Sequence, residues 1–167
     1  MLVRGLFIIV CSLAASAAVA RGNILYAGGG WAAIDRGEIC EAVSRSAKIA
    51  PRDKVQATAG FAFTADHRRW GEFHVQLSRN SRPGSSVILH LADIPFLLVA
   101  RGDVGWSRGP QQEQAIIAAA RSGGHMSVEA RDPSGVRFID PYVLEGAATA
   151  IDAAAARCAL RSAGKIR

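Results

Sequence analysis

The side chains of this sequence that could carry chemistry are few and widely spaced. Four histidines stand at positions 67, 74, 90 and 125, and no two of them have the HxH, HExxH or HxxxH spacing of a metal site. Two histidines on strands could still meet if those strands pair. One hypothesis is therefore a polar site, in a small hydrolase, that is built from Asp66, His67, His74 and His90. The alternative is that these are surface or hydrogen-bonded histidines without a catalytic role.

Other catalytic patterns do not occur in the sequence. It contains no GxSxG nucleophile motif, no phosphate-binding loop and no dinucleotide fingerprint. Pairs of carboxylates occur only beside turns, as with Asp132 and Asp140 or Asp35 and Glu38. We therefore assign no catalytic residue, no cofactor and no metal, and we favour a protein without enzymatic activity.

The first twenty residues have the pattern of a secretory signal peptide. One positive charge, Arg4, precedes the apolar run "LFIIVCSLAASAA", which is too short to span a bilayer comfortably. Small residues at 18 and 20 predict cleavage after Ala20. A lipoprotein signal needs a small residue just before its cysteine, but Val10 precedes Cys11, so we do not expect lipidation at Cys11. No later segment is long and apolar enough to cross a membrane, so we expect a soluble mature chain that is periplasmic or secreted; an uncleaved N-terminal helix is the alternative.

Cleavage would remove Cys11 and leave two cysteines, Cys40 and Cys158. In an oxidising compartment such a pair indicates one disulfide, because only one pairing exists. The bridge would close a loop of nearly the whole domain. In chain-entropy models, a disulfide that closes a loop of about 100 residues stabilises the folded state by roughly 4 to 5 kcal/mol. A metal or redox site is the alternative, although neither cysteine has a partner at CxxC spacing.

The charge of the mature chain limits the classes of partner. Without Arg4 the chain has 19 basic and 14 acidic residues, a net charge of +5, and the arginines are scattered. They form either a solvated surface or a basic face for an anionic envelope component, such as lipopolysaccharide or an acidic glycan. An exported location argues against nucleic acid. Trp70 follows "HRR" at 67–69 and could bind a glycan or an acidic surface, or could be an aromatic at a strand edge with arginines stacked on it.

The elements that must position these residues are mostly strands. In "EFHVQLSR", residues 72–79, strict alternation puts Phe73, Val75 and Leu77 on one face and His74 on the other. Turn signals recur about every ten residues, which favours antiparallel pairing over βαβ units. We also expect strands at 31–34, 39–43, 61–63, 87–91, 96–100 (fully buried), 125–132 and 136–140.

Two helices are expected in the second half. In "RGPQQEQAIIAAARSGG", residues 108–124, Pro110 suits the first helical position and Gly123 the C-terminal cap. The second helix begins near Gly146 and is rich in alanine. One stripe of it, with the spacing i, i+4, i+7, i+8 and i+11, would face the core and point Cys158 inward: Ala147, Ile151, Ala154, Ala155 and Cys158.

These patterns predict one domain. The fold class is mainly β with two helices, a single antiparallel sandwich or barrel-like domain with a C-terminal alanine-rich helix. We divide the chain into a signal peptide (1–20), a flexible leader with three consecutive glycines (21–30), a β-rich domain (31–160) and a C-terminal tail (161–167). Residues 46–60 have no clear period and are interpreted as a loop.

The second half resembles a known family. The segment "AAARSGGHMSVEARDPSGVRFIDPYVLEGAATAIDAAAARC", residues 118–158, has the order helix, glycine, strand, turn, strand, Leu-x-Gly and alanine-rich helix ending in cysteine. This resembles the C-terminal half of invasion-associated locus B-type proteins, small exported proteins of α-proteobacteria. Leu144, Gly146 and Ala150 stand where that family has S-L-x-G-F/A-x-x-A. The resemblance implies an exported β-rich protein without established enzymatic activity, in some members linked to host-cell interaction.

The function that we expect is that of an exported, non-enzymatic binding module of the cell envelope, with a protein or an anionic envelope component as partner. The alternatives are a small envelope hydrolase with a histidine and aspartate site, and a structural envelope stress factor. A hydrolase needs Asp66 and the histidines at 67, 74 and 90 to converge in a polar cleft. A binding module needs an exposed apolar or aromatic and basic patch.

Overall fold

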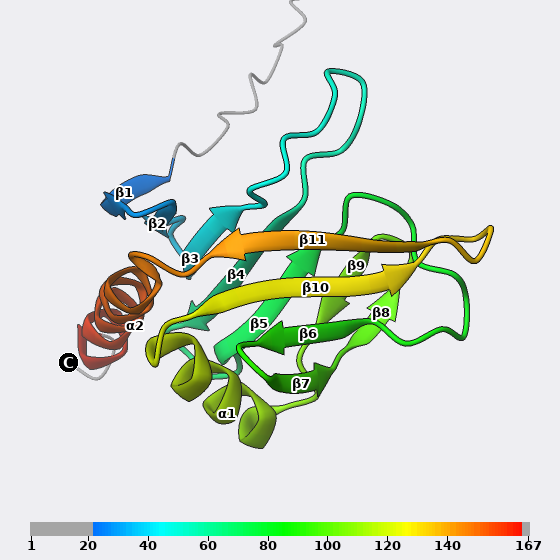
Figure 1. The fold of residues 1–167 in the computed structure, drawn as a ribbon. Helices are drawn as coiled ribbons and strands as arrows, with labels where there is room; N and C mark the ends of the chain where they lie inside the picture. Colours follow the sequence, from blue (N-terminus) through cyan, green and yellow to red (C-terminus); the bar gives the residue numbers. More distant parts are fainter. Residues whose placement is uncertain (1–21, 165–167) are drawn as a thin grey trace, which may run out of the picture.

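The structure is a computed structural model that describes residues 22–164 (Figure 1). The expected signal peptide, with Cys11 and the cleavage position after Ala20, lies outside the described residues, as does the end of the expected tail. The described part folds into two antiparallel sheets and two helices. The expected fold class, mainly β with two helices and an alanine-rich helix at the C-terminal end, is confirmed.

The larger sheet has seven strands within residues 22–164, in the order β1-β2-β3-β4-β5-β9-β8. All neighbours in it are antiparallel. Most strands are joined by short turns, as the spacing of turn signals predicts. The bounds are β1 (Asn23–Gly28), β2 (Trp31–Asp35), β3 (Ile39–Arg45), β4 (Thr58–Thr64), β5 (Trp70–Gln76), β8 (Val99–Arg101) and β9 (Val104–Trp106).

The smaller sheet has four strands within the same residues, in the order β11-β10-β6-β7, and all its neighbours are antiparallel. It lies across part of the larger sheet, as the front layer of Figure 1 shows. The bounds are β6 (Ile88–Leu91), β7 (Ile94–Leu97), β10 (His125–Arg131) and β11 (Arg137–Val143).

The two sheets bury their facing side chains in one core. Along β5 and the residue that follows it the alternation is as expected, since Phe73, Val75 and Leu77 are buried and the residues between them are half-buried. Opposite them the smaller sheet contributes a second buried layer. Its members are Leu89, Leu91, Met126, Val128, Ala130, Phe138 and Tyr142.

The two helices complete the layer that covers the larger sheet. Helix α1 (Pro110–Arg121) packs mainly on β5, and helix α2 (Ala147–Gly164) packs on β2 and β3 beside the smaller sheet (Figure 1). Pro110 stands at the start of α1, as expected. No helix among the described residues has the length and the hydropathy that a membrane crossing requires.

The segment 21–30 is not a flexible leader where the structure describes it. Residues 23–28 form β1, which pairs with β2, and the glycines at 28–30 make the tight connection between them. A Cβ atom at Gly29 would overlap the backbone of Glu145, and one at Gly146 would overlap the carbonyl of Gly28. Gly29 is therefore required for close packing of the β1–β2 turn on the start of α2, whereas a Cβ atom at Gly30 would meet open space. Composition alone cannot distinguish this use of glycine from flexibility.

The segment 96–100 is not one buried strand either. The chain leaves the smaller sheet at Leu97, the last residue of β7, and enters the larger sheet at Val99, the first residue of β8. Leu98, between them, is buried, whereas both its neighbours are exposed. A continuous apolar run usually indicates a strand covered on both faces, but here it marks the place where the chain changes sheets.

Helix α2 extends to Gly164, so the expected tail from 161 is helical as far as it is described. Its buried residues are Ala147, Ala150, Ile151, Ala154 and Cys158, and Ala155 is partly buried beside them. The stripe therefore faces the core, with Ala150 as an additional member. Cys158 forms a disulfide with Cys40 of β3, with the two Cα atoms 5.9 Å apart, which is the expected pairing.

Two arginines of α2 reinforce this attachment. Arg157 Nε and Arg161 Nη2 both donate to Asp35 Oδ2, at 2.6 and 2.7 Å, and Gly37 N donates to Asp35 Oδ1 at 2.9 Å. Burial by itself would raise the pKa of Asp35, but these hydrogen bonds and the arginine charges together lower it below its ordinary value. The helix is thus held to the β2–β3 hairpin by one covalent bond and one buried charge cluster.

Candidate functional site

The side chains of the expected polar site lie in three separate places. Asp66 and His67 are in the turn between β4 and β5. His74 is on the outer face of the larger sheet, because its neighbours Phe73 and Val75 point into the core. His90 is on the outer face of the smaller sheet for the same reason. Since the two sheets pack face to face, their outer faces point in opposite directions, and the four side chains do not form one site.

Asp66 and His67 have structural partners. Thr64 Oγ1 donates to Asp66 Oδ1 at 2.6 Å, and this bond, with one from Arg68 N, lowers the pKa of Asp66. The ring of His67 stacks on that of Trp70, with centroids 4.1 Å apart, and its Nε2 lies 3.2 Å from Ser162 Oγ of α2. Trp70 therefore packs against a histidine rather than under stacked arginines.

His74 and His90 differ in their surroundings. Burial lowers the pKa of His74, although the carboxylates of Glu41 and Glu72 act in the opposite direction. Its ring lies over Gly60, where a Cβ atom would come within 2.8 Å of Nε2. His90 Nε2 lies 3.6 Å from a Glu129 oxygen and has no hydrogen-bond partner among the described residues. Within residues 22–164, no three His, Cys, Asp or Glu side chains are grouped as metal ligands.

A different surface has the features of a binding site. Residues 46–57, called here the 46–57 loop, connect β3 to β4 and protrude beyond the sheets in Figure 1. Ile49 is 85% exposed, more than any other large apolar side chain among the described residues, and Val55 is 48% exposed. Between and beside them stand Lys48, Arg52 and Lys54, all exposed, with Asp53 as the single acidic residue.

The 46–57 loop is ordered by the side chain of Gln56. Its Oε1 accepts a hydrogen bond from Ala50 N at 2.9 Å, and its Nε2 donates to the carbonyls of Ser46, Lys48 and Ala57 at 3.2 to 3.3 Å. One amide thus joins both limbs of the loop. Such a loop, closed by its own side chain, presents its exposed residues in a fixed arrangement.

The base of the loop is attached to the smaller sheet. Ser46 Oγ and Ala47 N both donate to the carbonyl of Pro141 on β11, at 2.9 and 2.8 Å. Ser46 N also donates to Ala57 O, which closes the loop where it leaves the larger sheet. The loop therefore bridges the two sheets at one end of the sandwich.

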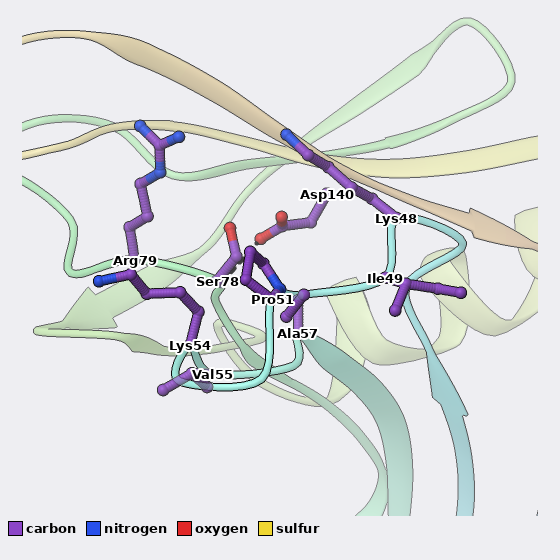
Figure 2. A pocket seen from close by; sticks show the side chains of 10 residues that line it. Lys48, Ile49, Pro51, Lys54, Val55, Ala57, Ser78, Arg79 and Asp140 are labelled. Atoms are coloured by element: carbon purple, nitrogen blue, oxygen red, sulfur yellow. Dashed lines mark hydrogen bonds between the residues drawn. The ribbon is translucent and has the colours of Figure 1, made fainter.

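A pocket of about 450 Å³ lies beneath the loop, between it and the end of β5 (Figure 2). This volume is within the range of small-molecule sites. Basic and apolar side chains surround it together, with a single carboxylate. The lining residues are Lys48, Ile49, Ala50, Pro51, Lys54, Val55, Ala57, Ser78, Arg79 and Asp140.

The carboxylate of Asp140 is at the inner end of this pocket, and the residue is 1% exposed. Within the described residues Asp140 accepts one hydrogen bond, from Ser78 N to Oδ2 at 2.9 Å, so Oδ1 has no protein donor. Tyr142, two residues along the same face of β11, has its pKa raised by burial and by the charge of Asp140. A ligand hydroxyl or N–H group that enters the pocket would find an acceptor in Asp140.

The remaining wall of the pocket is held by Arg79. Its Nη1 donates to Asp132 Oδ2 at 3.3 Å, and its guanidinium carbon lies 5.7 Å from the ring centre of Phe138. Arg79 therefore has structural partners, while Lys48 and Arg52 form no ion pair within residues 22–164. Lys48 and Arg52 are therefore the cations of the loop most available to a ligand, while Lys54 Nζ lies 3.8 Å from Asp53 Oδ2.

Sequence reasoning did not identify this site, because residues 46–60 have neither strand nor helix periodicity. A signal was nevertheless present in "KIAPRDKV", residues 48–55, where three basic residues and two branched apolar residues surround a proline. Asp140 could not have been assigned to the same site, since it is about 90 residues away in the chain and comes close only through sheet packing.

Comparison of the chain with protein-family models, with curated proteins and with solved structures gives no match. The functional interpretation therefore depends on the chain's own residues and on their arrangement.

Proposed function

We propose that this protein is an exported, non-enzymatic binding module of the cell envelope, and that the 46–57 loop and its pocket form the binding site. The observation that carries the proposal is the pocket of about 450 Å³ with exposed lysines at its rim and apolar side chains in its wall. The pattern of the first twenty residues supports an exported location, either periplasmic or secreted. The Cys40–Cys158 disulfide is compatible with an oxidising compartment.

The charge of the site favours an anionic envelope component over a protein partner. Lys48, Arg52 and Lys54 lie on a segment of twelve residues that contains one acid, Asp53. The attraction of such a cluster for an anion is strongest at low ionic strength and is screened by salt. The resemblance of residues 118–158 to invasion-associated locus B-type proteins supports the same class of function, an exported interaction protein.

The arrangement of the polar side chains does not support the alternative of a small envelope hydrolase. It required Asp66, His67, His74 and His90 to converge, and they occupy three separate places. No specific observation favours a structural stress factor over a binding module. We therefore retain one function.

The test is sedimentation of the purified mature protein with isolated cell envelope. We expect binding that weakens as salt is added and that is largely lost in the double variant Lys48→Glu/Lys54→Glu. As the control, Arg68→Glu/Arg101→Glu changes the net charge equally at exposed positions outside the loop and should retain binding.

Two further measurements make the outcome decisive. Binding that persists after proteinase treatment of the envelope supports a non-protein component, whereas its loss would indicate a protein partner instead. Mass spectrometry of the exported protein should show an N-terminus at Arg21 and no free thiol. Binding that is equal in the native protein and in both charge-reversal variants would refute the 46–57 loop as the site.

A further inference from the structure

The 46–57 loop has a feature that a soluble anionic ligand does not explain. Ile49 is 85% exposed at a protruding position, next to Lys48 in the chain and in the same loop as Arg52 and Lys54. Isolated exposed apolar side chains are common on protein surfaces and need no explanation. An isoleucine among three cations on a protruding loop is different, because it presents apolar and positive groups to the same partner.

We propose that the anionic component is a lipid surface, and that the 46–57 loop docks on it with its cations at the headgroups and Ile49 inserted among them. This inference rests on the proposed function and specifies its ligand. The membrane interface is the environment in which positive charge and an exposed branched apolar side chain are both stabilised.

The backbone of the loop suits such an environment. Backbone N–H and C=O groups that leave bulk water need partners within the protein. Gln56 supplies partners for Ala50 N and for the carbonyls of Ser46 and Lys48, and Lys54 N donates to Pro51 O at 2.9 Å. Pro51 has no N–H to satisfy. These bonds satisfy part of the backbone of the loop. The N–H groups of Arg52, Asp53 and Val55 have no protein acceptor among the described residues and stay hydrated in the headgroup layer.

Order in the loop also lowers the entropic cost of docking. A loop that is already closed by the Gln56 side chain and attached to Pro141 loses little conformational freedom when it binds. Figure 2 shows Ile49 and Val55 on the two limbs of this loop, with Lys54 beside Val55. Val55, 48% exposed, is the second apolar residue that could contact lipid.

The pocket beneath the loop provides a place for a headgroup. Its rim contains Lys48 and Lys54, which suit a phosphate, and its inner end contains Asp140, which can accept hydrogen bonds from hydroxyls. A phosphate that bears a glycerol group combines both chemistries. Phosphatidylglycerol is therefore the probe with which we test the inference.

The experiment measures cosedimentation of the mature protein with vesicles of phosphatidylcholine alone and of phosphatidylcholine mixed with phosphatidylglycerol. We expect binding only to the mixed vesicles, and weaker binding at high salt. Ile49→Asp should lower the partition coefficient by about 10-fold, since burial of one isoleucine side chain is lost. The matched control is Ile24→Asp, which changes an isoleucine that is 65% exposed on β1, and it should leave binding unchanged.

A second measurement separates insertion from simple charge attraction. Ile49→Trp and Ile24→Trp are each compared with the native protein on vesicles whose acyl chains are brominated, since bromine quenches tryptophan fluorescence on contact. We expect the fluorescence added at position 49 to be quenched and that added at position 24 to be unaffected. Equal quenching at the two positions would contradict insertion of the loop.

The two proposals fail in different ways. A protein that sediments with the cell envelope through Lys48 and Lys54, but does not bind phosphatidylglycerol vesicles, keeps the proposed function and overturns the lipid inference. A protein that binds the mixed vesicles equally well with Ile49→Asp and with Ile24→Asp also overturns it. A native protein that does not sediment with the cell envelope would overturn both the proposed function and the lipid inference.

Discussion

Charge and packing are closely linked at Asp35. Its side chain is 4% exposed, while those of its partners Arg157 and Arg161 are 41% and 29% exposed. The two arginines therefore keep contact with water and lose little hydration, and the carboxylate receives donors in exchange for the water that it loses. This arrangement avoids most of the cost of a fully buried ion pair.

We predict that Asp35→Asn lowers the free energy of unfolding by about 1.5 to 3 kcal/mol at pH 7, the range for hydrogen bonds to charged groups. Because the folded pKa of Asp35 lies below its unfolded value of about 3.9, its contribution is fully present above that pH and is lost as the pH falls through the folded pKa. The difference in free energy of unfolding between the variant and the native protein should therefore be smaller at about pH 3 than at pH 7. Urea unfolding at these two pH values measures this difference.

The matched control is Asp152→Asn. Asp152 pairs with Arg121, but both side chains are largely exposed, at 64% and 47%. Such a pair contributes about 0.5 kcal/mol or less. An effect of Asp35→Asn as small as that of the control would show that the two arginines do not hold α2 in place.

At the scale of secondary structure, the contact between the β1–β2 turn and the start of α2 depends on glycine. Gly146 has φ = 84°, a region that favours glycine, and the place of a Cβ atom is occupied by the carbonyl of Gly28. Gly37 has a similar φ of 93° but open space around it. A comparison of Gly37 with Gly146 therefore distinguishes the cost of backbone strain alone from the cost of strain combined with a steric clash.

We predict that Gly37→Ala costs about 1 to 2 kcal/mol, the energy of a left-handed backbone in a non-glycine residue. Gly146→Ala should cost clearly more, because the turn and the helix must also move apart. Thermal unfolding of both variants tests this ranking. Equal losses would mean that the backbone near Gly28 adapts without a penalty.

At the scale of the whole molecule, the two sheets are joined by the chain at Leu98. Leu98 is 3% exposed and its backbone N–H donates to Val87 O at 2.9 Å, while Leu97 is 42% exposed. Because the chain passes from one sheet to the other at a buried residue, we expect the sheets to unfold together in a single transition.

Leu98→Ala should therefore destabilise the whole domain by about 2 to 5 kcal/mol through the cavity that it leaves. Leu97→Ala, at the exposed neighbouring position, should cost less than about 1 kcal/mol. Denaturant unfolding monitored by tryptophan fluorescence and by circular dichroism gives both values. Transitions that do not coincide for the two probes would show that the sheets unfold separately.

The parts of the fold that could be predicted from the sequence depend on short-range patterns. Alternation in 72–79 places the buried side chains of β5, and the stripe that ends at Cys158 describes the buried face of α2, because both periods are properties of the local backbone. The disulfide was predictable for a different reason: the two cysteines outside the expected signal peptide have only one pairing.

Features that depend on distant contacts were not predictable in this way. The glycines at 28–30 have the composition of a flexible leader, and only the approach of Glu145 and Gly146 shows that Gly28 and Gly29 form a tight contact. The sequence does not decide whether the histidines at 74 and 90 are neighbours. They are separated because their strands belong to two different sheets. The buried Asp35 cluster joins residues more than 120 positions apart.

The sequence by itself determined the mainly β composition of this domain, its two helices and the inward direction of Cys158, since local periodicity is sufficient for each. Only the tertiary structure decided that the four polar residues are dispersed, that the apolar run at 96–100 changes sheets, and that the 46–57 loop stands over a pocket with Asp140 at its inner end. The physical reason is that these features depend on which strands become neighbours, and burial of the shared core selects that pairing.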